Sequence, residues 1–263
     1  MGAAPVTVRP TIDRAWLERA ARDDPLTHAY ALWDLEQFPD RVRFYSALRD
    51  DVTVGYLLVW PGRAALLVHW VGGLDAAPEL AALLPPRPVV VVAPDEVGDV
   101  VAAARGPVRT FEVLTLIAPP GAAGAEDGGA SVRRLRAADR PALLALTSTP
   151  EEMVASGYPY VDLDREAVWG AFDSGQLAGV ARTTVARESI WVLSGVFVDP
   201  ERRGLGFGHA LVRAVLADAA RAQVPVGLFV REDRPAARGV YDRAGFRPHG
   251  RRVWIDAGTG LDP

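Results

Sequence analysis

The sequence of 263 residues contains no cysteine and only four histidines. The lack of cysteine excludes disulfides, thiolate metal sites and a cysteine nucleophile, and it is compatible with a reducing cytoplasm. No two histidines have the close spacing of a helical metal pair, so we expect no metal site. The longest apolar region, residues 53–74, is interrupted by Pro61, Gly62 and Arg63, and the N-terminus lacks the pattern of a signal peptide. These absences favour a soluble, cytoplasmic protein with no membrane segment.

The sequence also lacks a large excess of charge of either sign: it has 29 basic and 33 acidic residues, for a formal net charge of -4. No basic stripe stands out against this balance, so nucleic-acid binding is not expected. With 49% hydrophobic and 24% charged residues, the composition is that of a globular protein. The length allows two domains of ordinary size or one large one.

The stretch at residues 118–130 has no periodicity and consists mostly of Ala, Gly and Pro. That composition is typical of a flexible connection. We therefore predict a first domain at residues 1–117, a linker at 118–130 and a second domain at 131–263.

Hydrophobic patterns in the second half predict a mixture of strands and helices. The expected order is a strand at 131–135, a helix after Asp139, a helix at 164–172, strands at 176–185 and 190–198, a helix from Leu205 to before Pro225, a strand at 226–230, a helix at 235–244 and a strand at 251–255. This order favours a mixed α/β (α+β) fold, with a mostly antiparallel sheet that contains at least one strand–helix–strand crossover.

The first half shows a weaker echo of this order, with strands expected at 54–57, 64–71 and 89–92. Only residues 72–86 separate the last two, whereas the second half uses residues 199–224 and contains a Gly-rich turn. Two interpretations stay open: a degenerate copy of the second domain, or an architecture of its own.

The segment Arg203-Gly204-Leu205-Gly206-Phe207-Gly208 lies between a predicted strand and a predicted helix. Glycines let an anion approach the backbone, and the first amides of a helix have no partner within it, so the segment predicts an anion cradle. Arg202 and Arg203 add positive charge beside it. The glycine spacing fits neither the phosphate loop of nucleoside triphosphatases nor the dinucleotide-binding turn. The alternative is a turn that only caps the helix.

Two motifs carry a resemblance to a known family. Arg203-x-x-Gly206-x-Gly208, preceded by Val-x-Val-Asp-Pro-Glu-Arg, is similar to the coenzyme A pyrophosphate motif of the GNAT superfamily of N-acetyltransferases. Residues 234–246 resemble the later Asn-x-x-Ala-x-x-x-Tyr-x-x-x-Gly-Phe helix of that family, although Arg234 replaces the usual Asn. The resemblance covers about residues 131–255. The second half also resembles the group related to glycine N-acyltransferases. The resemblance implies the GNAT fold, in two tandem GNAT-like domains if the first half is a degenerate copy.

The resemblance also implies that acetyl-CoA is the cosubstrate and that the cradle, the preceding strand and the later helix bind it. The implied contacts are Val196, Phe197, Val198, Arg202, Arg203, Gly204, Leu205, Gly206, Phe207, Gly208, His209, Arg234 and Ala237. The strand at 194–198 is expected to pair with the pantetheine and to supply a backbone amide for the thioester oxyanion.

For the chemistry, Tyr241 is the expected proton donor to the departing thiolate, with a role in core packing as the alternative. No carboxylate lies on the strand before the cradle. Ser194 could order a water that carries the amine proton away, and Glu188 or Glu232 could act remotely, with an ordinary surface or strand position as the alternative for each of the three. The aromatic residues Tyr158, Tyr160, Trp169 and Phe172 could line an acceptor pocket, although core packing explains aromatic residues more often.

The predicted function is transfer of an acetyl or short acyl group to a primary amine of a small molecule or peptide, by a monomer or homodimer. The alternative is a catalytically silent acyl-CoA-binding sensor or interaction module.

Overall fold

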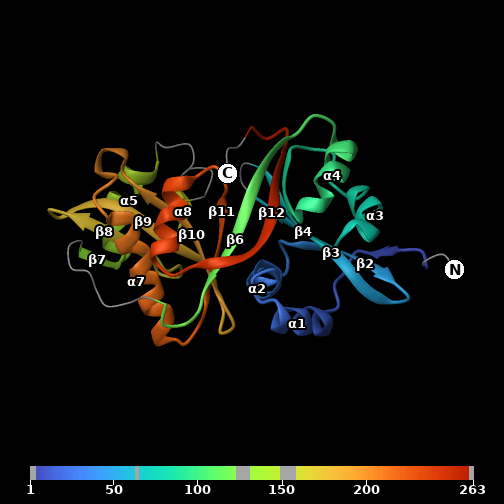
Figure 1. Ribbon diagram of the computed structural model, residues 1–263, viewed down its shortest axis with the longest axis horizontal. Helices are drawn as coiled ribbons and strands as arrows, with labels where there is room; N and C mark the ends of the chain where they lie inside the picture. Colours follow the sequence, from blue (N-terminus) through green and yellow to red (C-terminus); the bar gives the residue numbers. More distant parts are fainter. Residues whose placement is uncertain (1–3, 63–64, 123–130, 149–157, 261–263) are drawn as a thin grey trace. The chain divides into compact units, whose positions relative to one another are not determined.

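The computed structural model describes residues 4–62, 65–122, 131–148 and 158–260, and the chain divides into two compact units (Figure 1). The first unit contains residues 1–114 together with 250–263, and the second contains residues 115–249. Among the described residues, no helix is both long enough and apolar enough to cross a membrane.

The first unit contains a sheet built from both ends of the chain. Its elements are β1 (Thr7–Arg9), α1 (Arg14–Asp23), α2 (Ala29–Gln37), β2 (Arg43–Arg49), β3 (Val52–Pro61), β4 (Leu66–Val71), η1 (Leu74–Ala76), α3 (Ala77–Ala81), β5 (Val89–Ala93), η2 (Asp95–Val97), α4 (Gly98–Arg105) and β12 (Arg247–Ala257); β6 (Arg109–Ala118) crosses the division between the units. Strands β1 to β4 pair antiparallel in order, β4 pairs parallel with β5, and β5 pairs antiparallel with β12.

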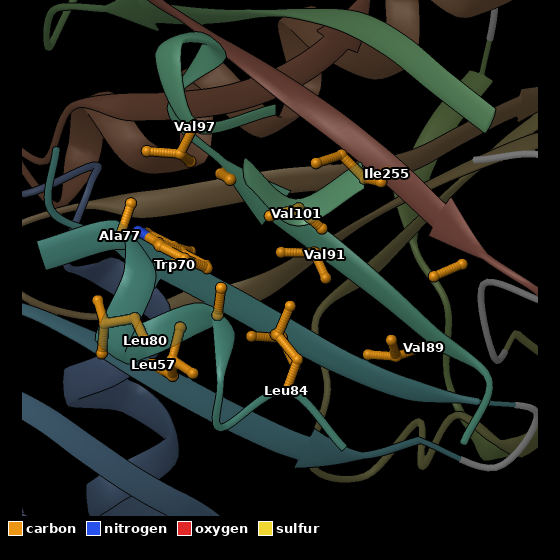
Figure 2. Packing of buried hydrophobic residues seen from close by; sticks show 14 of the residues in the cluster. Leu57, Trp70, Ala77, Leu80, Leu84, Val89, Val91, Val97, Val101 and Ile255 are labelled. Carbon is orange, nitrogen blue, oxygen red and sulfur yellow. The ribbon is translucent and has the colours of Figure 1, made fainter. Parts of the chain in front are cut away.

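Helices cover both faces of this sheet. Successive residues of a strand point to opposite faces, so neighbouring apolar residues of β3 pack against helices on different sides. Leu58 packs with Leu17 of α1 and Leu32 of α2 on one face. Leu57 packs on the other face with residues of α3 and α4, as Figure 2 shows for Leu80 and Val101. Burial of each such side chain contributes about 1.5–3 kcal/mol relative to its exposure to water.

The second unit has a similar arrangement. Its elements are β7 (Ser131–Arg134), η3 (Ala137–Asp139), α5 (Arg140–Thr147), η4 (Tyr158–Tyr160), β8 (Val168–Asp173), β9 (Gln176–Ala186), β10 (Trp191–Val198), η5 (Pro200–Arg202), α7 (Phe207–Arg221), β11 (Val226–Arg231) and α8 (Pro235–Arg243). Strands β7 to β10 pair antiparallel in order, and β10 pairs parallel with β11. Helix α7 buries Leu211, Val215 and Ala219, which are spaced by one helical turn, and it packs against β9 and β10.

The mixed α/β fold and the strands expected around the Gly-rich segment are confirmed, as are the helices that became α7 and α8. The helix expected at 164–172 is wrong, because residues 168–173 form strand β8. Residues Val168 to Ala171 are all buried, and a short run that is apolar on every side carries no period that separates a helix from a strand. Gly170 lies so close to Leu135 that a Cβ there would be 2.4 Å from Leu135 Cδ2.

The compact units also differ from the expected domain boundaries. Residues 250–263, which we expected in the second domain, belong to the first unit, because β12 pairs with β5 through Val253 to Ala257. Of the expected linker at 118–130, residues 123–130 lie outside the described part of the chain, and β6 extends to Ala118.

The order of elements repeats between the units. In each, a hairpin (β3–β4 or β9–β10) leads through a helical segment to a strand that pairs parallel with the second strand of the hairpin. Gly55 and Gly179 occupy matching places, since a Cβ on Gly55 would be 2.7 Å from Val71 O and 3.4 Å from Leu80 Cδ1, and a Cβ on Gly179 would be 2.7 Å from Phe197 O and 3.2 Å from Leu211 Cδ1. The described residues between β4 and β5 form only η1 and the short helix α3 where the second unit has α7.

Candidate functional site

The Gly-rich segment connects β10 to α7 through a tight turn. Asp199 begins it, and its Oδ1 accepts a hydrogen bond of 3.1 Å from the Glu201 amide at the start of η5. Gly204 and Gly206 then have φ values of +81° and +88°, which residues with a side chain rarely adopt. Gly206 is the N-cap of α7, so the chain enters the helix in a left-handed conformation that favours glycine.

The turn presents its backbone to open space. A Cβ added to Gly204 or Gly206 would meet no atom within 4 Å, and Leu205 between them is 66% exposed. The first bond of the helix runs from Ala210 N to Gly206 O, so the amides of residues 207–209 precede the helical ladder at the positive end of the dipole. These features fit an anion that approaches the backbone.

The two arginines before the turn have different surroundings. Arg202 Nη2 donates to Gln176 Oε1 at 2.6 Å, and Arg202 Nε lies 3.6 Å from Asp173 Oδ2, so this guanidinium is directed at the β8–β9 turn. Arg203 Nε donates to Val198 O at 3.2 Å, at the end of β10. The structure therefore keeps the charge of Arg203 beside the cradle and engages Arg202 with the neighbouring hairpin.

Strands β10 and β11 separate before they reach the cradle. Their parallel ladder contains the three pairs from Trp191–Val226 to Leu193–Leu228, although β10 continues to Val198 and β11 to Arg231. Beyond Leu193, the β11 side of β10 is therefore outside the ladder. Val196 and Val198 are partly exposed there, and Phe197 is buried.

Two of the predicted site residues have buried side-chain atoms without a hydrogen-bond partner. One is Ser194 Oγ on β10, and the other is His209 Nε2 in the first turn of α7. A buried polar atom without a partner costs stability, and it marks a place where a ligand or water can bind. Ser194 lies opposite Arg182 of β9 in the antiparallel register.

Helix α8 supplies Tyr241, which is 8% exposed and packs edge-on against Phe246 with 5.7 Å between ring centroids. Burial raises the pKa of its hydroxyl to about 12, so the phenol is protonated at neutral pH. Ala237 lies one turn earlier on α8 and is partly buried, and Arg234 is the exposed N-cap of this helix. The start of α7 lies next to α8, because a Cβ on Gly208 would be 3.9 Å from Val240 Cγ2.

Three of the four aromatic residues expected at an acceptor pocket occupy surface or packing positions. Tyr160 is 53% exposed, and Phe172 is half-buried, with the Arg133 guanidinium carbon 4.3 Å from its ring centroid. Trp169 is 2% exposed and donates from Nε1 to Asp218 Oδ2 at 3.0 Å, so it belongs to the core. Tyr158 is the exception, because its hydroxyl donates to the Gly195 carbonyl at 2.6 Å. The sequence pattern did not predict this contact, and its only signal was the isolated Gly195 within a strand pattern.

The described residues contain no group of three or more metal-ligating side chains. A pocket of about 490 Å³ on the second unit is lined by residues of β7, by the β8–β9 turn and by Phe207. Of the residues expected to bind acetyl-CoA it includes only Phe207, and of the aromatic residues expected at an acceptor pocket only Phe172, so we place the candidate site at the cradle and the separated strands rather than at this pocket.

Known proteins share both the sequence pattern and the fold. Residues 132–246 match the model of the acetyltransferase (GNAT) family. A Drosophila protein has 16% identity and a TM-score of 0.73, with 99% of this chain and 100% of that chain covered. A GCN5-related N-acetyltransferase from Sphaerobacter thermophilus has 19% identity and a TM-score of 0.62, with 99% of each chain covered.

The repeated arrangement also has a counterpart. A tandem GNAT protein from the clavulanic acid biosynthesis pathway has 18% identity and a TM-score of 0.62, with 98% of this chain and 100% of that chain covered. At such identities the structural similarity shows the fold alone, and the family assignment rests on the sequence match at 132–246. The chain therefore has the GNAT fold, and it carries a domain of the acetyltransferase (GNAT) family at residues 132–246.

Proposed function

We propose that the protein is an N-acyltransferase that moves an acetyl or short acyl group from acyl-CoA to a primary amine of a small molecule or peptide. The observation that carries the proposal is the pairing of an open, glycine-lined helix N-terminus with two parallel strands that separate beside it. A pyrophosphate fits the first, and an extended pantetheine fits the second as an additional strand. Membership of the GNAT family supports the reaction class.

In the proposed reaction the amine attacks the thioester carbon, so that a C–N bond forms as the C–S bond breaks. Acyl-CoA, when bound, would supply the activated acyl group as its thioester. Backbone amides at the end of β10 stabilise the developing oxyanion. Tyr241 donates its proton to the thiolate and regains one from solvent, while the proton of the amine leaves through a water held by Ser194.

A second function is favoured by one observation, the lack of a carboxylate on residues 191–198 of β10. A protein that kept the cradle and lost efficient deprotonation of the amine would bind acyl-CoA without turnover. Such a protein would act as a sensor or interaction module.

Binding of acetyl-CoA, measured by calorimetry, tests the cradle. We expect Gly206→Glu to weaken binding by at least about tenfold, because its carboxylate and its Cβ would occupy the anion site. Gly106→Glu is the matched control, since Gly106 also has a positive φ of +80° and open space around it, but lies in the first unit. Equal affinities of the two variants would contradict the assignment.

Turnover separates the two functions. Release of free coenzyme A thiol, followed with a panel of primary amines, is expected from wild-type protein. Tight binding without thiol release across amino acids, polyamines, amino sugars and peptides would favour the silent module instead.

A further inference from the structure

Strand β10 contains a β-bulge at the point where it leaves β11. Between Ser194, opposite Arg182, and Phe197, opposite Val180, β10 advances by three residues and β9 by two. The extra residue lies at Gly195 or Val196, two or three residues after Leu193, where the parallel pairing with β11 ends. A bulge redirects the peptide groups around it, so this feature sets the direction of the amides that face the gap.

Tyr158 of η4 fits against this bulge. Its hydroxyl donates to Gly195 O at 2.6 Å, and the side chain is fully buried. Gly195 has a φ of +54°, and a Cβ there would lie 2.5 Å from Tyr158 Cε2. The ring therefore occupies the space that a side chain at residue 195 would need, and the glycine and the tyrosine depend on each other.

The ring of Tyr158 is itself held in place. The Arg182 guanidinium carbon lies 4.9 Å from the ring centroid, and Arg182 Nη1 lies 3.7 Å from Glu166 Oε2. Burial raises the pKa of the Tyr158 hydroxyl well above its usual value, so the phenol remains a proton donor at neutral pH.

The bond to Gly195 O affects the amide on the other end of the same peptide group. The peptide between residues 195 and 196 is trans, so the Val196 N–H points away from Tyr158. A hydrogen bond donated to the carbonyl also polarises that N–H and strengthens it as a donor.

We propose that Tyr158 is a positioning residue for the acyl-transfer site: it fixes the β10 bulge through Gly195 and thereby aims and polarises the Val196 amide toward the thioester carbonyl. This inference rests on the proposed function. In this role Tyr158 does not contact substrate, and it does more than fill the core.

Infrared spectroscopy of bound acetyl-CoA, labelled with ¹³C at the thioester carbonyl, tests the proposal without an acceptor. In wild-type protein we expect the carbonyl band to lie at lower wavenumber than for free acetyl-CoA. In Tyr158→Phe we expect most of that displacement to be lost, with the dissociation constant changed by less than about threefold, because the other coenzyme contacts remain. With an accepted amine, kcat should fall about tenfold at unchanged KM for acetyl-CoA.

The matched control is Tyr56→Phe, which removes another buried tyrosine hydroxyl, bonded to His28 Nδ1 at 2.9 Å in the first unit. This control should lower the melting temperature and leave the carbonyl band unchanged. If Tyr158→Phe does not fold, Gly195→Ala provides the same test, because its Cβ displaces the ring.

The outcomes are distinguishable. A wild-type band displacement that Tyr158→Phe or Gly195→Ala retains would overturn the role of Tyr158 and leave the transferase proposal standing. Wild-type protein that binds no acetyl-CoA would overturn the proposed function, and the role of Tyr158 with it.

Discussion

Ser194 and His69 hold equivalent places in the two hairpins, and their surroundings differ. Arg182 faces Ser194, three residues after Gly179, and Leu58 faces His69, three residues after Gly55. His69 is stacked on Tyr30 of α2 with 4.6 Å between centroids, whereas Ser194 Oγ has no partner. In the first unit an aromatic stack thus occupies the place where the second unit has the Ser194 hydroxyl without a partner. This difference supports one acyl-CoA site in the chain.

The enclosure of His69 predicts a pH dependence of stability. Burial lowers its pKa to about 4, from an ordinary value near 6.5. Between these values the unfolded chain binds the proton and the folded chain does not, so stability is lost as the pH falls from about 6.5 to 4, by up to about 3 kcal/mol. His69→Phe keeps the stack and removes the titration.

Urea unfolding of both proteins at several pH values measures this effect. The difference in unfolding free energy between wild type and His69→Phe should change steadily across the window, because the remaining titratable groups are common to both. A constant difference from pH 7 to pH 4 would show that His69 does not titrate differently on folding.

Tyr241 provides a second prediction at the level of one residue. With its pKa at about 12, the phenol stays protonated through neutral pH, as an acid must. Tyr241→Phe should lower kcat by roughly 10²-fold or more and leave acetyl-CoA binding nearly unchanged. Thiol release under saturating conditions measures the effect, and full activity of Tyr241→Phe would leave only the core-packing role.

The predictability of the site also differs from residue to residue. Gly204, Gly206 and Tyr241 could be proposed as site residues because glycine and aromatic residues at fixed spacing form a local motif. The direction of Arg202 toward Gln176 could not, since it depends on a contact with a distant turn. Tyr158 was identifiable only as an aromatic residue, because its bond joins residues 37 positions apart.

At the scale of elements, the position of α7 matters most, because its first turn forms the cradle. Asp218 anchors the helix from its other end. Its Oδ2 accepts from Arg134 Nε of β7 at 3.1 Å and from Trp169 Nε1 of β8 at 3.0 Å, and Arg221 Nη2 lies 2.7 Å from its Oδ1. One carboxylate thus joins the helix to two strands.

Asp218→Ala should destabilise the second unit by about 1–3 kcal/mol, because it leaves the buried Trp169 donor without an acceptor. Arg221→Ala is the control: that side chain is 71% exposed, and its loss should cost well under 1 kcal/mol. Urea unfolding followed by tryptophan fluorescence compares the two. Equal losses would mean that the contacts to β7 and β8 contribute no more than the surface ion pair.

The elements with a regular period were predictable, namely β9, β10, α7 and α8. Strand β8 was not, because Val168 to Ala171 are buried on every side and carry no period. The bulge in β10 was not predicted either. Its position depends on the register with β9, which a single strand pattern does not encode.

At the scale of the whole molecule, the last strand, β12, joins the sheet of the first unit, which contains the N-terminal part of the chain. Residues 253–257 pair with β5, and Val253, Ile255 and Ala257 join the core shown in Figure 2. The pattern of β12 predicts a strand, but it carries no information about which sheet it joins. Because β12 joins the sheet of the first unit, the compact units differ from the domain boundaries expected from composition.

A substitution in β12 tests this assignment. Ile255 is fully buried, so Ile255→Ala should cost roughly 2–5 kcal/mol. If β12 belongs to the first unit, amide hydrogen exchange should accelerate most in β4 and β5. The matching variant Leu228→Ala, in buried β11 of the second unit, should instead accelerate exchange most in β9 and β10. If Ile255→Ala instead accelerated exchange most in β9 and β10, the last strand would belong to the second unit. That result would contradict the pairing of β12 with β5.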